Sequence, residues 1–179
     1  MSGPAENLTP MVHAAQNRCF GCGQGNPLGL QLEFLLATDG SVVSLPTVPE
    51  SFDGHPGYLH GGIIATLLDE AMSKAVRALG LTAMTRQIEV EYLRPVPSGK
   101  ALRIEARVLR SEGRKHWAEA RILSGNSSTL ATGKTLKTNK TLATAKALFV
   151  EVRFGRLVAG RPEDRPATGS SPQAISEPC

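Results

Sequence analysis

The chain of 179 residues is poor in several residue types and patterns on which large protein classes depend. Aromatic residues make up only 4% of it, and they do not alternate with basic residues as in binders of single-stranded nucleic acid. No apolar run approaches the roughly 20 residues that span a bilayer, and the N-terminus lacks the features of a signal or transit peptide. We therefore expect a cytoplasmic protein with neither nucleic acid nor a membrane as a partner.

Cysteine is also scarce, with only three residues, two of them in the segment Cys19-Phe-Gly-Cys22. Three cysteines cannot make a disulfide framework, but CxxC spacing can begin a zinc site. A closed site needs two further ligands, and the sequence contains no second CxxC and no close pair of histidines. The spacing therefore favours a tight glycine turn, and we expect no metal and no other cofactor.

The most informative stretch is His60-Gly61-Gly62, which is followed by a carboxylate at Asp69. The two glycines stand where an amphipathic pattern begins, so a helix should start there and its backbone can approach a ligand closely. The first N–H groups of a helix have no partner within it and lie at the positive end of its dipole. Such a terminus can stabilise a developing negative charge, and a carboxylate about two turns further on could act on the same ligand. The combination indicates chemistry on a carbonyl group.

The helix is predicted to run from about residue 61 to residue 79, and Gly80 is well placed to end it. At about 100° per residue, Asp69 falls at the seam between the apolar and polar faces, whereas Glu70 projects from the middle of the polar face. We therefore interpret Glu70 as solvated surface. Ser73 lies one turn after Asp69, within reach of the same small molecule. A plain amphipathic helix with a glycine N-terminus would show the same spacing.

Segments of alternating apolar and polar residues predict antiparallel strands on both sides of this helix. Asp39-Gly40 is typical of the turn of a hairpin between the first two. One long helix accompanied by such strands predicts an α+β fold, with an antiparallel sheet wrapped around the helix. The expected strands are residues 28–38, 41–48, 83–94, 101–110, 116–123 and 142–153.

The region after residue 123 contains a repeat, because TLATGKTL at residues 129–136 recurs as TLATAKAL at residues 141–148. We assign the last strand to the second copy because a hydrophobic run follows it, although the first copy could take that place instead. We expect a flexible arm over residues 1–17, one folded domain over 18–155 with a possible insertion at 126–140, and a disordered tail over 156–179.

The motif HGG with a carboxylate nine residues after the histidine resembles the signature of hotdog-fold acyl-CoA thioesterases of the PaaI-like, phenylacetate-type group. Two more segments are similar to that family, TRQIEVEYLRPVPSGKAL at residues 85–102 and CFGCGQGNPLGLQLEF at residues 19–34. The resemblance implies an enzyme with a hotdog fold that hydrolyses an acyl-CoA thioester without a cofactor. It also implies a homodimer, or a homotetramer of two dimers, whose active site forms between two chains.

The resemblance assigns roles to individual residues. Asp69 would be the general base or nucleophile, the Gly61 N–H the oxyanion donor, and Ser73 would help to place water. His60 would either bond the substrate or orient the Gly61 peptide, or it would be a structural residue that fixes the loop. Gly62 would contact substrate as part of the same glycine pair. Basic residues would have to bind the CoA phosphates, and the candidates are Arg86, Arg94, Lys100, Arg103, Arg114 and Lys115.

One position departs from the family pattern. Many relatives carry Asn or Gln six residues before the HGG histidine, where the side-chain amide contacts the thioester carbonyl. This chain has Gly54 there, with His55 next. Either His55 supplies the contact with the substrate or no residue does.

Two other functions stay open. His55 lies fourteen residues before Asp69, as in hotdog β-hydroxyacyl thioester dehydratases, which pair a loop histidine with a helix carboxylate. Against that function, the phenylalanine that precedes the proline in those enzymes is missing, and the HGG segment would have no role. The second alternative is a non-catalytic module that binds acyl-CoA.

Overall fold

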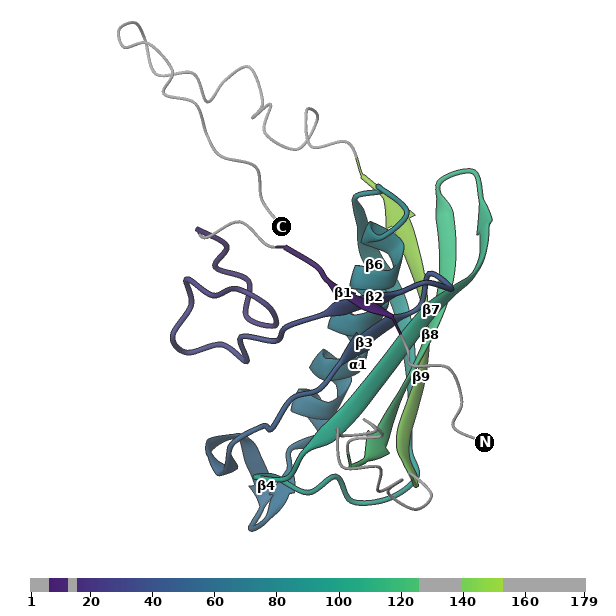
Figure 1. Cartoon of the computed structure of the whole chain (residues 1–179). Helices are drawn as coiled ribbons and strands as arrows, with labels where there is room; N and C mark the ends of the chain where they lie inside the picture. The colour runs from purple at the N-terminus through teal and green to yellow at the C-terminus, as the bar shows by residue number, and fades with distance from the viewer. Residues whose placement is uncertain (1–6, 13–15, 126–139, 153–179) are drawn as a thin grey trace, which may run out of the picture.

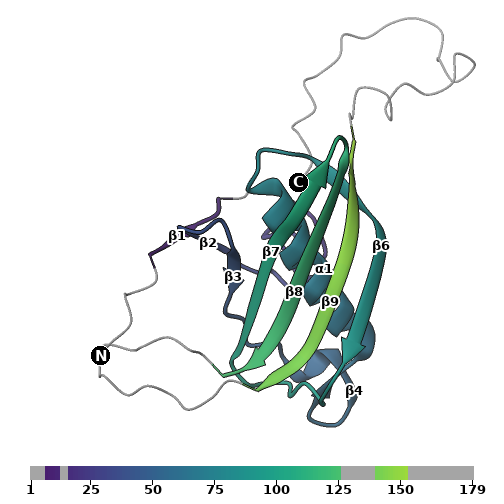
Figure 2. The same cartoon turned by 90° about the vertical axis from the view of Figure 1, so that its right-hand side faces the viewer.

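The computed structural model describes residues 7–12, 16–125 and 140–152. Seven antiparallel strands form one sheet in the order β1-β2-β3-β7-β8-β9-β6, and a single long helix, α1, packs across one face of it (Figures 1 and 2). A separate hairpin, β4-β5, lies near the N-terminal end of the helix. The expected α+β arrangement of an antiparallel sheet around one helix is confirmed.

The described elements follow one another in a simple order. They are β1 (Leu8–Pro10), β2 (Leu35–Ala37), β3 (Val42–Ser44), the 3-10 turn η1 (Glu50–Phe52), β4 (Asp53–His55), β5 (Tyr58–Leu59), α1 (Gly61–Arg77), β6 (Ala83–Tyr92), β7 (Leu102–Glu112), β8 (Lys115–Ser124) and β9 (Thr141–Glu151). In the described part of the chain, no helix is both long and apolar enough to cross a membrane.

Helix α1 has the boundaries that its sequence predicts. It begins at Gly61, and just beyond its last residue, Arg77, Gly80 has a φ of +77°, in the left-handed region that glycine favours. The Gly80 N–H donates to the Arg77 carbonyl at 2.8 Å, which closes the end of the helix. One side of the helix is buried against the sheet and forms the core with β7, β8 and β9, through Ile64, Leu67, Leu68, Ala71, Met72, Ala75 and Val76.

The hairpin predicted at Asp39-Gly40 is confirmed as well. Gly40 has a φ of +81°, and the Ala37 N–H donates to the Ser41 carbonyl at 2.9 Å. This turn sets the register in which β2 pairs with β3.

The first predicted strand is much shorter than expected. Of residues 28–38, only β2 is extended and paired. The Gly29 N–H donates to the Asn26 carbonyl in a turn, and Gln31 has a φ of +48°, which interrupts an extended chain. The second predicted strand, residues 41–48, is likewise reduced to β3.

The N-terminal segment differs from the flexible arm expected over residues 1–17. Within it, β1 pairs with β2 in the register Leu8↔Ala37, and Asn17 is buried. The segment 51–59, which is not among the predicted strands, contains the β4-β5 hairpin. Both pairings depend on contacts that the local sequence pattern does not report.

The last strand is β9, which is formed by the second copy of the repeat, as predicted. It pairs with β8 on one side and with β6 on the other, so it lies inside the sheet. Apart from Lys140, the possible insertion at 126–140 lies outside the described residues, and so does the expected tail over 156–179.

Candidate active site

The N-terminus of α1 is capped by His60, whose backbone is extended with φ −60° and ψ 141°. The Gly62 N–H donates to the Nδ1 atom of His60 at 2.9 Å. Because a backbone N–H can only donate, Nδ1 is the acceptor, and the neutral ring carries its proton on Nε2. His60 therefore fixes the start of the helix and keeps an Nε2–H donor on an exposed side chain, so the two roles considered for it are compatible.

The Gly61-Gly62 peptide is held from both sides. Its N–H is bound by His60, and its carbonyl oxygen, which belongs to Gly61, accepts a hydrogen bond of 3.1 Å from the Tyr92 hydroxyl. In the described part of the chain, the Gly61 N–H makes no hydrogen bond. The Gly61 N–H expected as the oxyanion donor is therefore available to a ligand, whereas the Gly62 N–H is occupied.

Gly54 is packed directly against this histidine. A Cβ atom at Gly54 would lie 2.9 Å from His60 Cα and 3.4 Å from His60 Cδ2. An Asn or Gln at this position would therefore push the capping residue away. The departure from the family pattern thus has a packing reason, and Gly54 itself offers no side chain to a substrate.

His55 lies in the β4-β5 hairpin, where it is exposed and pairs with Tyr58. The hairpin is held by Asp53, whose Oδ2 accepts the Gly57 N–H at 2.7 Å. No hydrogen bond among the described residues joins His55 to Asp69 or to His60.

Asp69 is half-buried, and its Oδ1 accepts a hydrogen bond of 2.7 Å from the Thr85 hydroxyl of β6. Burial raises the pKa of Asp69 above its ordinary value, the Thr85 hydrogen bond opposes this, and the nearby Glu70 charge adds to the rise. A carboxylate with a raised pKa is a stronger base once it is ionised. Ser73 is half-buried one turn further along α1, as expected.

Two residues of this site, Thr85 and Tyr92, were not found from the sequence. Both lie on β6, whose pairing with β9 shifts register between Thr85 and Gln87. This irregularity breaks the alternation from which the face of each side chain would be inferred. The only signal was the polar run Thr85-Arg86-Gln87 at the start of an otherwise alternating strand.

Gly61 and Asp69 are eight residues apart on the same helix. At a rise of about 1.5 Å per residue, this separates them by about 12 Å along the axis. An oxyanion donor must lie about 3 Å from the reacting oxygen, so the two groups of one chain cannot serve the same carbonyl. The expectation that they act on one ligand therefore depends on a second chain, as the family resemblance implies.

Glu70 is not the solvated residue that the helical pattern predicts. Its side chain is 13% exposed, and its Oε1 lies 3.0 Å from the Nζ of Lys74, which is 3% exposed. The loop around Cys19 covers this side of α1, and the Cys19 thiol donates to Glu70 Oε2 at 3.6 Å. Burial is the largest single influence and lowers the pKa of Lys74, but Glu70 and Cys22 together raise that pKa by more, so the net pKa is raised and the ammonium form is stabilised.

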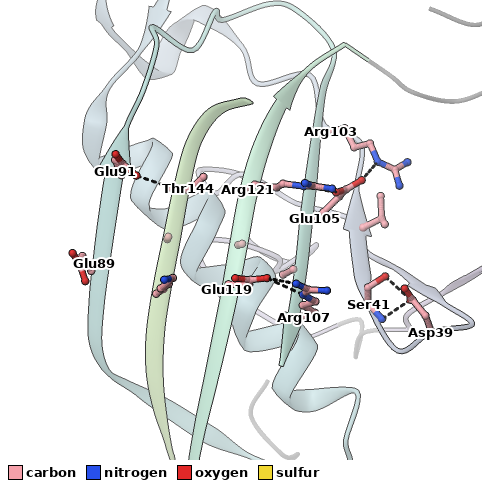
Figure 3. Close-up of a pocket in the computed structure, with 15 residues that line it drawn as sticks. Asp39, Ser41, Glu89, Glu91, Arg103, Glu105, Arg107, Glu119, Arg121 and Thr144 are labelled. Atoms are coloured by element: carbon pink, nitrogen blue, oxygen red, sulfur yellow. Dashed lines mark hydrogen bonds and ion pairs between the residues drawn. The ribbon is translucent and has the colours of Figure 1, made fainter. Parts of the chain in front are cut away.

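A hollow of about 620 Å³ lies elsewhere, on the face of the sheet away from α1 (Figure 3). Its charges are largely paired, since Glu105 contacts Arg103 at 2.5 Å and Arg121 at 2.7 Å. Burial alone would raise the pKa of Glu105, but the hydrogen bonds from both arginines hold it below its usual range. Arg103 is buried, so it is not the cleft-entrance cation that was considered for CoA, and neither Asp69 nor Gly61 lines the hollow.

Comparisons with known proteins show which families and structures the chain is similar to. Residues 56–131 match the thioesterase superfamily. The acyl-coenzyme A thioesterase THEM4 of Xenopus laevis is 36% identical over 83 residues, which cover 46% of this chain and 37% of that protein. Its counterpart from Rattus norvegicus is 32% identical over 82 residues, covering 46% and 35%. The match thus spans little more than a third of these relatives.

Solved structures show the same fold. A thioesterase superfamily protein superposes with a TM-score of 0.64 at 28% identity, covering 75% of this chain and 60% of that one. PaaI of E. coli gives a TM-score of 0.57 at 22% identity, with 69% and 81% covered. A hypothetical thioesterase of Streptococcus pneumoniae TIGR4, solved with coenzyme A, gives 0.54 at 22%, with 64% and 80% covered. The chain has the hotdog fold of these proteins, and its residues 56–131 match the thioesterase superfamily.

Proposed function

We propose that this protein hydrolyses the thioester of an acyl-coenzyme A, with the Gly61 N–H as the oxyanion donor and Asp69 as the base or nucleophile. The observation that carries the proposal is the Gly61-Gly62 peptide, which His60 and Tyr92 hold so that only the Gly61 N–H is left to a ligand. Relatives named as acyl-coenzyme A thioesterases and a structural neighbour solved with coenzyme A support the choice of substrate. The cytoplasmic location expected from the sequence is part of this proposal.

The chemistry follows from the two groups. The thioester carbonyl accepts a hydrogen bond from the Gly61 N–H, and a donor aimed at the developing oxyanion contributes about 2.7–4 kcal/mol of barrier lowering. Asp69 removes a proton from a water that adds to the acyl carbon, or attacks that carbon itself and is released by water. The C–S bond then breaks, and the proton passes to the leaving thiolate. Ser73 would hold the water, and the His60 Nε2–H would be a second donor to the carbonyl.

The 12 Å separation within one chain is the reason that we include a homodimer in the proposal. Strand β6 pairs only with β9 among the described residues, so its other edge is open (Figure 2). Met84 and Tyr92 on this strand are 55% and 54% exposed, so a single chain leaves large side chains of this open edge uncovered. Two copies that pair through β6 would bring Gly61 of one chain towards Asp69 of the other.

The dimer is tested by changing one apolar side chain of that edge. Met84→Glu places a charge on the proposed interface, so we expect a fall to the mass of one chain in sedimentation equilibrium and loss of thioesterase activity. Leu109→Glu is the matched control, because Leu109 is 47% exposed on β7, away from β6. A parent protein that sediments as a monomer with full activity contradicts the dimer.

The function is tested by measuring thiol release from a panel of aryl, medium-chain and long-chain acyl-CoAs and from acyl carrier protein thioesters. We expect release from at least one of them. Hydration of crotonyl-CoA is followed in parallel, since hydration without thiol release would favour the dehydratase. Tight binding of acyl-CoAs without turnover would favour the non-catalytic module and would overturn the proposal.

The hydrogen bond from Thr85 predicts a pH effect. Thr85→Val removes the interaction that lowers the pKa of Asp69, so that pKa should rise further. Because the base acts only when ionised, the acid limb of the profile of kcat/KM against pH should move to higher pH. Thr144→Val, on β9 outside the site, is the control. An acid limb that stays in place or moves to lower pH contradicts this role for Thr85.

A further inference from the structure

The loop between β1 and β2 passes on the side of α1 away from the long strands (Figure 1), where it brings two thiols to the Glu70 carboxylate. The Sγ atoms of Cys19 and Cys22 and an oxygen of Glu70 all lie within 4.8 Å of one another. The proposed hydrolysis uses none of these side chains. We infer that Cys19, Cys22 and Glu70 are ligands of a zinc ion.

The spacing of the ligand atoms suits that ion. Zinc binds thiolates at about 2.3 Å and carboxylates at about 2.1 Å, so a tetrahedral site has an S···O edge of about 3.6 Å. The distance from Cys19 Sγ to Glu70 Oε2 is 3.6 Å. In the metal-free protein the same spacing is that of an S–H···O hydrogen bond, so zinc can replace the thiol proton without moving either side chain far.

Glu70 divides its two oxygens between this cluster and Lys74. Oε1 contacts the Lys74 ammonium at 3.0 Å, and Oε2 faces the Cys19 thiol. Zinc at Oε2 therefore leaves the ion pair in place, and a ligating carboxylate commonly has such an outer partner. The charges also balance, because the two thiolates and the carboxylate offset the metal and the buried ammonium.

The loop is shaped around the cluster. A Cβ atom at Gly21 would lie 2.6 Å from Glu70 Oε2, so a residue without a side chain is needed for the carboxylate to approach. The Asn17 side-chain amide donates to Cys22 Sγ at 3.3 Å, and its Oδ1 accepts the Cys19 N–H at 2.8 Å. Such donors to sulfur and to the ligand loop orient ligands before the metal arrives.

The zinc ion would fix the loop to α1 at Glu70, which directly follows the proposed base Asp69. Cys22 is buried, whereas Cys19 is only half-buried, so a water can reach the fourth position from the Cys19 side. The sequence predicted no metal because the third ligand comes from a helix 51 residues after Cys19. No local motif indicates a ligand at that distance.

The test is a titration of the reduced, full-length protein with Co²⁺, which reports its ligands by absorption. We expect one equivalent to give thiolate-to-cobalt charge-transfer bands and the visible bands of a tetrahedral site, and one equivalent of Zn²⁺ to displace it. Zinc should also raise the melting temperature, because it binds the folded state. These readouts do not depend on thioesterase activity.

Three variants and one control decide which residues bind the ion. Cys19→Ser and Cys22→Ser should abolish the charge-transfer bands, and Glu70→Gln should weaken metal binding at least about tenfold while a thiolate signal remains. Cys179→Ser should leave the titration unchanged. This control distinguishes metal binding by the cluster from non-specific binding by any cysteine thiol. The inference is overturned if the reduced parent protein gives no charge-transfer band, or if the band survives in Cys22→Ser.

Discussion

Asp69→Asn is expected to reduce turnover of acyl-CoA by about 10²–10⁴-fold, the usual contribution of a positioned base. Asparagine has nearly the same shape, and its side-chain oxygen can still accept the Thr85 hydrogen bond. It cannot take a proton from water or form an acyl intermediate as a carboxylate can. The loss should therefore appear in kcat, measured by thiol release at saturating substrate.

The same substitution, Asp69→Asn, should not reduce the stability of the folded protein. The folded pKa of Asp69 is raised, so the folded state binds this proton more tightly than the unfolded state does. Stability from this group is thus present at low pH and is lost as the pH rises through the folded pKa. At neutral pH the uncharged asparagine avoids that loss, so Asp69→Asn should melt no lower than the parent. Asp39→Asn, on an exposed turn, should leave turnover unchanged, and a fully active Asp69→Asn would refute the mechanism.

Gly61→Pro is expected to lower kcat by about 10²–10³-fold, because it removes the N–H that would hold the oxyanion. Proline is favoured at the first position of a helix, where its missing N–H breaks no helical bond. His60 already has the extended ψ of 141° that a residue before proline adopts, and Gly61 does not have a positive φ. The helix should therefore form normally, which circular dichroism would show.

Gly61→Ala is the matched control, because it adds a Cβ but keeps the N–H. That Cβ would lie 3.7 Å from the Tyr92 ring, an ordinary contact. We expect the alanine variant to retain most of the parent activity. Equal losses in both variants would mean that the space at residue 61 matters and that its N–H does not.

Mixing the two inactive variants tests the shared site directly. If Gly61 of one chain serves Asp69 of the other, a mixed dimer has one complete site and one site with neither group. Random exchange of chains would then restore about a quarter of the parent activity, as expected for a two-fold dimer. No recovery after exchange would place both groups in the same chain, which the helix length disfavours.

The sequence predicts this fold best where the signal is local. The Asp39-Gly40 turn and the end of α1 at Gly80 each depend on a few adjacent residues, and both are as expected. The assignment of β9 to the second repeat also held, because the hydrophobic run after it was visible in the sequence. The strand expected over residues 28–38 is much shorter than predicted, because turns near Gly29 interrupt it despite its apolar composition.

The site shows what local patterns miss. Thr85 reaches Asp69 across 16 residues and Tyr92 reaches Gly61 across 31, so both contacts depend on tertiary packing. Glu70 was misjudged because the helical pattern distinguishes only the side that faces the sheet. A loop from elsewhere in the chain covers the other side, and no periodicity in α1 reports it.

The two ends of the sheet differ in a way that limits how far copies of this protein can join. At one end β1 has three residues, and the last of them, Pro10, has no N–H to give to a neighbour. At the other end β6 has ten residues. Joining two molecules through their β6 ends leaves only the short, proline-containing ends outward. Such outward ends are poor templates for pairing with the strands of further copies.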